Sequence, residues 1–319
     1  MSKSRSKLVF GAAWAVSAAF SPLARAQIPQ DPAAGAATDP KPKPPPYSLP
    51  WQLRPVVPGN VVRSDTALAF YESPANGASG TTIASMLLAS YKVVPELAPL
   101  VRLGVVSSAP PAPAESAFNF INPVIGATYG PNIGKNLKLG LFLGLALPFG
   151  MGGGEDPEPA DAAANGAGIV ARSAMDNAMF AVNYFTVFPG VGFAYVGNGL
   201  TVQVEATLLQ LTKTRGPDAA DDSNSNFTTG LHVGYFFVPM LSAGAEIRHQ
   251  RWLSTPAAVE ADSTGALRDT TTFAVGPRFH FKLGEATWLR PGIAFAMAID
   301  DPLADSKYKI VQIDVALAF

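Results

Sequence analysis

The chain closes on the stretch VQIDVALAF (residues 311–319), in which apolar residues alternate with polar or small ones. One set of alternate positions carries the apolar side chains of Val311, Ile313, Val315, Leu317 and Phe319. The other set carries those of Gln312, Asp314, Ala316 and Ala318. Successive side chains of a β-strand point to opposite faces, so this stretch predicts a strand with one apolar face and one polar or small face.

The same period of two recurs along the chain, with apolar side chains on one parity and polar, glycine or alanine residues on the other. We expect strands at 60–72, 81–92, 98–108, 116–129, 136–149, 174–195, 199–214, 226–238, 240–254, 268–283, 286–299 and 306–319. That makes about 12 strands, and 14 is the alternative if 50–58 and 191–196 are separate strands. Both are short for a membrane strand, so we expect 50–58 to extend the first strand and 191–196 to continue a strand across a bulge.

The terminal strand, with its apolar face and final Phe319, resembles the C-terminal assembly signal of bacterial outer-membrane β-barrel proteins. The resemblance implies an all-β fold, a transmembrane antiparallel up-and-down barrel with a porin-like channel architecture. It also implies a multi-pass protein of the outer membrane, in contact with lipid, whose residues Val311 to Phe319 are read by the barrel-assembly machinery. We expect the terminal strand to close the barrel against the strand at 60–72. Short connections, such as 94–96 and 197–199, are expected on the periplasmic side, and longer ones, such as 150–173, outside the cell.

The N-terminal residues have the pattern of a cleaved secretory signal peptide. Lys3, Arg5 and Lys7 precede an apolar run at 8–20, and Ala24-Arg25-Ala26 offers a cleavage site after Ala26. We therefore divide the chain into a signal peptide at 1–26, a Pro-rich disordered periplasmic segment at 27–50 and the barrel at 51–319.

Composition agrees with a membrane barrel and excludes some other classes of protein. Hydrophobic residues make up 48% of the chain and charged residues 15%, yet beyond the signal peptide no apolar run approaches a spanning helix. Hydrophobicity spread over alternate strand positions is how a barrel faces lipid. The formal net charge of −1 gives no reason to expect nucleic acid as a partner.

Catalysis is not expected. The sequence has three histidines and no cysteine, and no His is followed two positions later by Ser, the pairing used by outer-membrane phospholipases. The carboxylates of the long loops lack the spacing of a calcium-binding loop. We therefore predict no enzyme activity, no catalytic residue, no cofactor and no metal site.

The side chains that point into the lumen should decide the function. A barrel of about 12 strands has a lumen wider than one that side chains fill and narrower than an open pore. Many inward residues are small and should leave space: Gly104, Gly126, Gly140, Gly144, Gly230, Gly234, Gly244, Gly276, Gly292, Ala294, Ala296 and Ala298. Inward basic residues outnumber acidic ones, eight against four: Arg63, Lys92, Arg102, Lys138, Arg248, Arg278, Lys282 and Arg290, against Asp65, Glu205, Glu246 and Asp314.

The leading hypothesis is a narrow diffusion channel for small hydrophilic solutes, with a preference for anions. Arg248, Arg278 and Arg290 are the candidates for a ring of positive charge. Glu246 and Asp314 should orient them. With the turns as register marks, His232, Glu246, Arg278 and Asp314 should lie at similar heights. The alternatives are an ion-pair network that braces the barrel and a non-conducting structural or surface-binding barrel that acts through its external loops.

Overall fold

The structure, a computed structural model, describes residues 47–73, 76–218, 220–261, 266–301 and 303–319. The predicted signal peptide and most of the Pro-rich segment lie outside the described residues. Among those that are described, no helix is long and apolar enough to span a membrane.

Strands make up most of the described chain, and helices occur in two of the connections between them. The strands are β1 (Val61–Glu72), β2 (Ser79–Ser90), β3 (Leu97–Ala109), β4 (Ala117–Phe120), β5 (Val124–Tyr129), β6 (Leu137–Ala146), β7 (Tyr184–Gly197), β8 (Leu200–Lys213), β9 (Ser223–Val238), β10 (Leu241–Trp252), β11 (Asp269–Phe279), β12 (Phe281–Lys282), β13 (Trp288–Ala298) and β14 (Lys309–Ala318). The helices are α1 (Pro159–Ala171), α2 (Asn177–Phe180), α3 (Ala257–Glu260) and the short 3₁₀ helix η2 (Ala266–Arg268).

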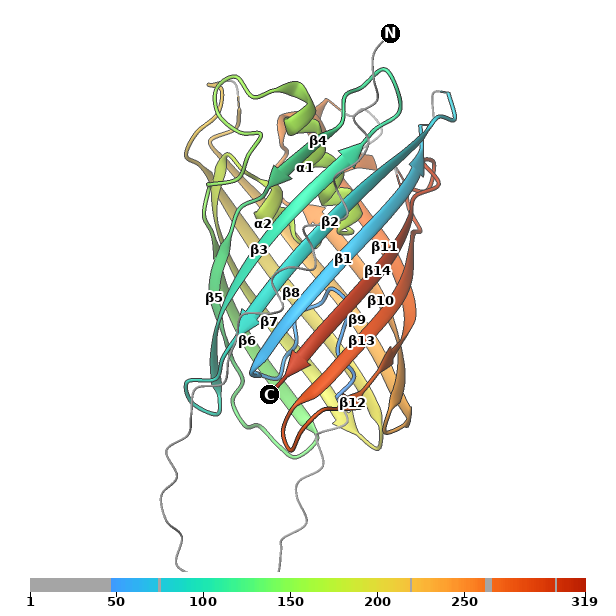
Figure 1. Cartoon of the computed structure of the whole chain (residues 1–319). Coiled ribbons are helices and arrows are strands. Elements are labelled where there is room, and N and C mark those ends of the chain that lie inside the picture. The colour runs from blue at the N-terminus through green and yellow to red at the C-terminus, as the bar shows by residue number, and fades with distance from the viewer. Residues whose placement is uncertain (1–46, 74–75, 219, 262–265, 302) are drawn as a thin grey trace, which may run out of the picture. The chain divides into compact units, whose positions relative to one another are not determined.

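The strands form one antiparallel sheet that closes on itself as a barrel (Figure 1). Consecutive spans of the wall pair with each other, and the first strand, β1, pairs with the last, β14, from Val61 opposite Ala318 to Phe70 opposite Lys309. β4 and β5 share one span, as do β11 and β12, so 14 strands make 12 spans. The predicted count of 12 and the predicted closure of the terminal strand against the first are confirmed.

The two faces of the wall follow the predicted parity. On β13, Ile293 and Phe295 are 48% and 41% exposed on the outside, whereas Ala294 between them is 2% exposed and faces inward. On β14, Ile313 and Val315 face outward and Asp314 inward. The outside of the barrel is therefore an apolar surface suited to lipid. One predicted inward residue is misplaced, because Lys282 is exposed in β12 beside a short turn.

The prediction for 174–195 is wrong in its first part. Residues 174–183 belong to the connection that contains α1 and α2, and the strand begins only at Tyr184. Phe180 and Val182 are not strand residues. Their side chains therefore need not follow the alternation of β7, and no bulge is needed in that strand. The pairing of β7 with β8 keeps one register on both sides of Pro189.

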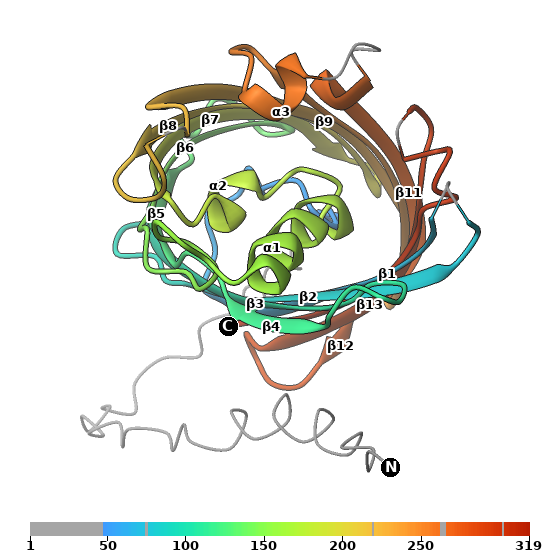
Figure 2. The same ribbon diagram turned by 90° about the horizontal axis from the view of Figure 1, so that it is seen from above.

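Two parts of the chain lie inside the barrel. Residues 47–60, blue in Figure 1, occupy the half nearer the short turns, and Figure 2 shows α1 and α2 within the ring of strands at the other end. The expected strand extension at 50–58 is therefore wrong, and the described end of the Pro-rich segment, from Tyr47 to Pro50, is buried except for Leu49, which is partly so. Residues 47–58 are called the lumenal segment below, and 147–183 the lumenal loop.

Candidate functional site: the occupied lumen

The lumenal segment lies in spaces that the predicted inward glycines leave open. A Cβ atom added to Gly230 would come within 2.5 Å of Leu53, and one added to Gly292 within 2.6 Å of Trp51. Gly140 and Gly192 both face Val56 at distances that a Cβ could not keep. The missing side chains of the wall are therefore matched by side chains of the segment, and Trp51 and Leu53 are almost fully buried.

The wall also binds the backbone of the segment. The carboxylate of Glu246 accepts hydrogen bonds from the backbone N–H groups of Trp51 and Gln52. Arg63 donates to the carbonyl oxygens of Pro50, at 3.0 Å, and Trp51. An irregular segment must find partners for its backbone groups outside itself, and here charged side chains of the wall supply them.

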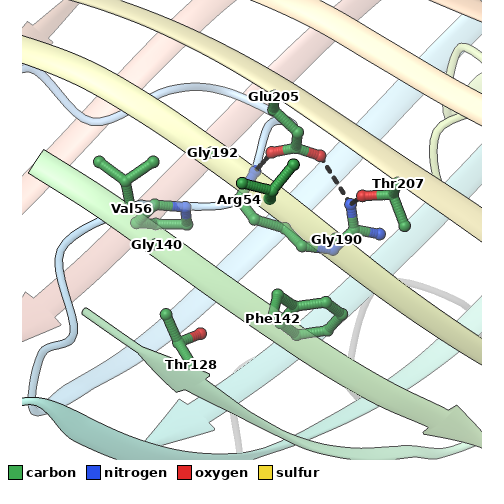
Figure 3. Close-up of a pocket in the computed structure, with 11 residues that line it drawn as sticks. Arg54, Val56, Thr128, Gly140, Phe142, Gly190, Gly192, Glu205 and Thr207 are labelled. Atoms are coloured by element: carbon green, nitrogen blue, oxygen red, sulfur yellow. Dashed lines mark hydrogen bonds and ion pairs between the residues drawn. The ribbon is translucent and has the colours of Figure 1, made fainter. Parts of the chain in front are cut away.

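The lumenal segment is also attached to the wall in its C-terminal half, at Arg54 (Figure 3). The guanidinium of Arg54 donates to Glu205 at 2.6 Å and to Thr207 at 2.8 Å, and it lies 4.8 Å from the ring centre of Phe142. The space left here, about 10 Å³, is about that of one water molecule. The packing at this anchor is therefore close.

Charged and polar side chains of the lumenal loop bind the wall, beside contacts of the loop backbone with Asn119, Asn122 and Arg215. Arg172, which caps the C-terminus of α1, donates two hydrogen bonds of 2.8 Å to the two carboxylate oxygens of Asp65 on β1. Asp176 accepts from Arg172 at 3.0 Å and from Arg102 of β3 at 2.7 Å. Asn177 of α2 donates to Asn226 of β9 at 3.2 Å.

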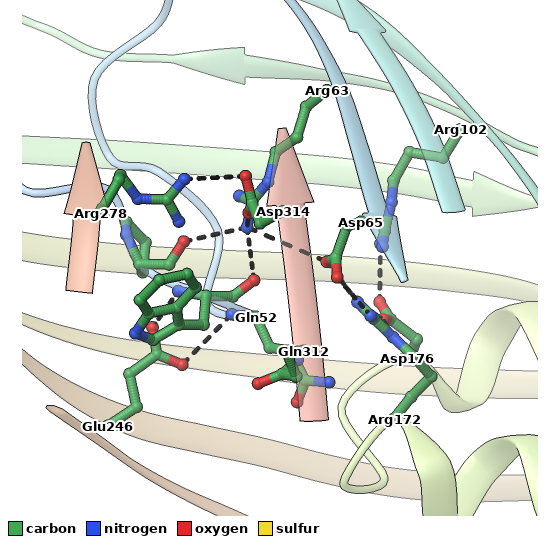
Figure 4. Close-up of polar contacts among 12 residues, drawn as sticks. Gln52, Arg63, Asp65, Arg102, Arg172, Asp176, Glu246, Arg278, Gln312 and Asp314 are labelled. Carbon is green, nitrogen blue, oxygen red and sulfur yellow. Dashed lines mark hydrogen bonds and ion pairs between the residues drawn. The ribbon is translucent and has the colours of Figure 1, made fainter. Parts of the chain in front are cut away.

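Two carboxylates between the lumenal segment and the lumenal loop, those of Asp65 and Asp314, each lie between two arginines. Figure 4 shows Asp65 between Arg172 of the loop and Arg63, and Asp314 between Arg63 and Arg278. The Arg63 Nη2 atom is 3.9 Å from Asp65 Oδ2, and Arg278 Nη1 is 2.8 Å from Asp314 Oδ1. The guanidinium of Arg278 also lies over the ring of Trp51, 4.4 Å from its centre. One network of charges therefore runs from the loop to the segment.

The six predicted lumenal residues all face inward, but the structure does not place the three arginines around open water. Arg248 is buried against Glu246 and Gln312, each at 2.8 Å, and Arg278 against Asp314. Arg290 donates to His280 at 2.9 Å and to the carbonyl of Tyr47 at 2.7 Å. Glu246 contacts Arg248 and Asp314 contacts Arg278, whereas Arg290 contacts neither carboxylate. The role of these residues in selectivity stays a prediction.

His232 lies opposite Glu246 across β9 and β10, with its Nδ1 atom 3.3 Å from that carboxylate, and it is fully buried. The predicted common height of four residues separates into two levels. His232 pairs with Glu246, whereas Arg278 lies level with Asp314 through Gly292. Within the described chain, no group of three or more His, Cys, Asp or Glu residues has the arrangement of a metal site.

A cavity of about 310 Å³ lies between the segment and the short turns. Its lining includes Lys92, Glu96 and Lys138 from the wall and Tyr47 and Pro58 from the segment. The segment therefore forms the inner end of a vestibule on the predicted periplasmic side.

The strongest comparisons are with solved membrane barrels. No family model matches this chain, and no curated protein matches it. The COG4313 outer membrane channel from Pseudomonas putida F1 is 14% identical, with 86% of this chain and 100% of that one covered and a TM-score of 0.52. The fold is that of an outer-membrane β-barrel. Lower TM-scores, both 0.47, are found for the KdgM porin in complex with disordered oligogalacturonate and for the NanC porin. These are 10% and 7% identical over 81% and 80% of this chain, and over 99% and 98% of their own.

Sequence reasoning missed two groups of site residues. Arg54 and Trp51 lie in a stretch interpreted as a strand extension, and Arg172 and Asp176 in or beside one interpreted as an external loop. The cluster of inward glycines was a usable signal for the first group. It was interpreted as free space. In the structure Gly140, Gly230, Gly234 and Gly292 face the lumenal segment, whereas Gly104, Gly126, Gly144, Gly244 and Gly276 face other residues of the wall.

Proposed function

We propose that the protein is a diffusion channel for small hydrophilic solutes whose passage is closed, in this conformation, by the lumenal segment and the lumenal loop. The observation that carries the proposal is the match between inward glycines and the side chains of the segment. A purely structural barrel can fill its lumen with side chains of its own wall. Here the wall leaves space, and a separable part of the chain occupies it.

The way the segment is bound also supports a removable occupant. The Nε1 atom of Trp51, both amide atoms of Gln52 and the Nε2 atom of Gln312 are buried and have no hydrogen-bond partner among the described residues. Each unpaired buried polar group costs about 1 to 3 kcal/mol. The conformation with the segment inside the lumen is therefore less stable than its contacts alone suggest. The free energy needed to displace the segment is lower by the same amount.

Single-channel conductance in planar bilayers tests the proposal. The wild-type protein is compared with a variant that lacks residues 47–58 and in which a short Gly-Ser linker replaces residues 152–181 of the lumenal loop, because either element alone can close the passage. Heat-modifiability confirms that both proteins are folded. We expect the loss of both elements to raise the conductance severalfold. A folded deletion variant that conducts no ions would support the non-conducting structural or surface-binding barrel instead, which the occupied lumen also favours.

We further propose that the channel prefers anions. Along the lumen and its ion pairs, the described chain has seven arginines and five carboxylates: Arg54, Arg63, Arg102, Arg172, Arg248, Arg278 and Arg290, against Asp65, Asp176, Glu205, Glu246 and Asp314. Fixed positive charge in a narrow aqueous passage concentrates anions. Arg290 has no carboxylate within ion-pair distance among the described residues, so it should contribute most.

Reversal potentials under a salt gradient measure this preference. The variants Arg278→Gln and Arg290→Gln should both reduce it, Arg290→Gln by more. Cation preference in the wild type, or no change in either variant, would contradict anion selectivity and leave the channel proposal standing.

Assembly and localisation are also proposals. The outward face of β14, from Val311 to Phe319, has the form that barrel-assembly machinery reads at the C-terminus of outer-membrane proteins, and the export of the chain would rest on the cleaved signal peptide at 1–26. Deleting Phe319 should lower the amount of heat-modifiable folded protein in the outer membrane. An unchanged yield would remove the assembly role of this residue.

A further inference from the structure

We propose that the lumenal segment and the lumenal loop are coupled through Arg63 and Asp65, so that release of the segment loosens the loop. This inference rests on the proposed function, because it describes how one closed passage responds at both ends. Its mechanism is competition between two arginines for one carboxylate.

Arg63 has two kinds of partner while the segment is inserted. Its Nη2 atom donates to the backbone carbonyls of Pro50 and Trp51 and forms an ion pair with Asp314. The same atom is 3.9 Å from Asp65, well beyond hydrogen-bond distance. The segment therefore holds Arg63 away from Asp65.

Asp65 is consequently free to bind the loop. Both of its oxygens accept from Arg172 at 2.8 Å, in the bidentate geometry that gives the strongest arginine–carboxylate pairs. The oxygen Oδ2 is the one nearest to Arg63 as well. One oxygen atom thus lies between two guanidinium groups, and only one of them binds it at full strength.

Loss of the segment changes this balance in a definite direction. Arg63 loses two carbonyl acceptors, and a buried guanidinium with unpaired donors turns toward the nearest available acceptor. Arg63 already binds Asp314, which Arg278 shares, so Asp65 is the further carboxylate within reach of the freed Nη2 atom, 3.9 Å away. As Arg63 moves to Asp65, Arg172 loses part of its bidentate contact, and the loop opens more often.

The absence of cysteine from the sequence allows a direct measurement of this opening. The reporter is Ala178→Cys in α2, a site only 3% exposed. Its reaction with a water-soluble maleimide measures how often the loop leaves the lumen. In the variant lacking residues 47–58 the rate should rise about tenfold, because local opening limits labelling of a buried thiol.

A second way to displace the segment avoids a deletion. The variant Gly230→Leu fills the place of Leu53 and should accelerate labelling in the same direction. The comparison variant Gly104→Leu overpacks the wall at Met86 and Ile121, in the buried cluster that includes Ala178, and so measures how labelling responds when the surroundings of the loop are disturbed without the segment. Heat-modifiability identifies any variant that is not folded.

The decisive variant combines the deletion with Arg63→Gln. Without Arg63 no competitor for Asp65 remains, so labelling of the reporter thiol introduced by Ala178→Cys should fall back to within about threefold of the wild-type rate. A purely structural effect of the deletion would not be reversed in this way. Unchanged labelling in folded segment-free protein, or no reversal by Arg63→Gln, overturns the coupling.

Conductance of the variant that lacks both the lumenal segment and residues 152–181 separates this inference from the channel proposal. Accelerated and reversible labelling of segment-free protein, when the variant lacking both elements never conducts, supports the coupling and overturns the channel. Conductance without accelerated labelling supports the channel and overturns the coupling.

Discussion

The lumenal segment and the lumenal loop fill the same barrel, but they are held in different ways. The segment has no regular structure, and wall side chains such as Glu246 and Arg63 bind its backbone. The loop satisfies much of its backbone within α1 and α2, and side-chain pairs such as Arg172 with Asp65 attach it. The difference teaches that the loop brings charged side chains of its own to the wall, whereas the segment depends on the charges and the spaces that the wall supplies.

The largest expected effect is on the charged anchor of the loop. The variant Asp65→Asn breaks the bidentate pair with Arg172 and leaves that arginine with Asp176 as its one buried counter-charge among the described residues, and breaking a buried pair costs about 3 to 5 kcal/mol. Urea unfolding should show this loss. The control Asp222→Asn removes a carboxylate that is 94% exposed, beside Lys213, and should cost about 0 to 1 kcal/mol. Equal losses in the two variants would show that the loop does not depend on its buried anchor.

A substitution on the lipid-facing side of the barrel tests whether the wall and the lumenal segment are independent. Ile293→Arg places a cation in the outward apolar surface and should destabilise the barrel by about 2 to 4 kcal/mol. Trp51 should stay buried, because Ile293 points away from the lumen. Urea unfolding measures the first effect and acrylamide quenching of Trp51 the second, with Trp252 and Trp288 replaced by Phe. Increased quenching of Trp51 would mean that the wall and the segment are not independent.

The shape of the wall is tested by Gly230→Leu. Overpacking of this kind costs about 1 to 3 kcal/mol, and here it should also displace Leu53 and shift the fluorescence of the neighbouring Trp51 to longer wavelength. Gly104→Leu should cost a similar amount without the shift. If both variants leave Trp51 unshifted, the segment does not depend on the glycine spaces.

The smallest effect expected is that of pH. Burial alone would raise the pKa of Asp176, but Arg102 and Arg172 outweigh it and hold that pKa below its usual range. A lowered pKa stabilises the folded state above the unfolded-state value of about 3.9, and the stabilisation is lost as the pH falls through the folded value. The difference in urea midpoint between the wild type and Asp176→Asn should therefore be constant from about pH 5 to 8 and shrink only below about pH 4. A change in this difference near neutral pH would mean that another titrating group is responsible for the attachment of the loop.

The sequence predicted the wall well because period two is a local signal. Ile293, Ala294 and Phe295 take the faces that their alternation predicts, and β14 closes against β1 as expected. The bounds failed where apolar residues had another role. Phe180 packs on Gly168 of α1. Its place in the alternation expected for a strand is a coincidence.

The contents of the lumen could not be predicted in the same way. The contacts of the segment are largely backbone groups, which every residue carries, so its amino acids give little sign of them. Arg248, Glu246, Arg278 and Asp314 could be placed on the inward face from the sequence because all four lie on regular strands. Arg172 and Trp51 lie outside the strands, where no periodicity fixes a direction.

The position of the lumenal segment in the sequence has a consequence for the order of folding. Its partners lie far along the chain: Glu205 is 151 residues from Arg54, Glu246 is 195 from Trp51, and Arg290 is 243 from Tyr47. Contacts this distant form late, because loop closure must come first. Residues that precede every strand are thus the last to reach their places, and substitutions in them should change the rate of unfolding far more than the rate of folding.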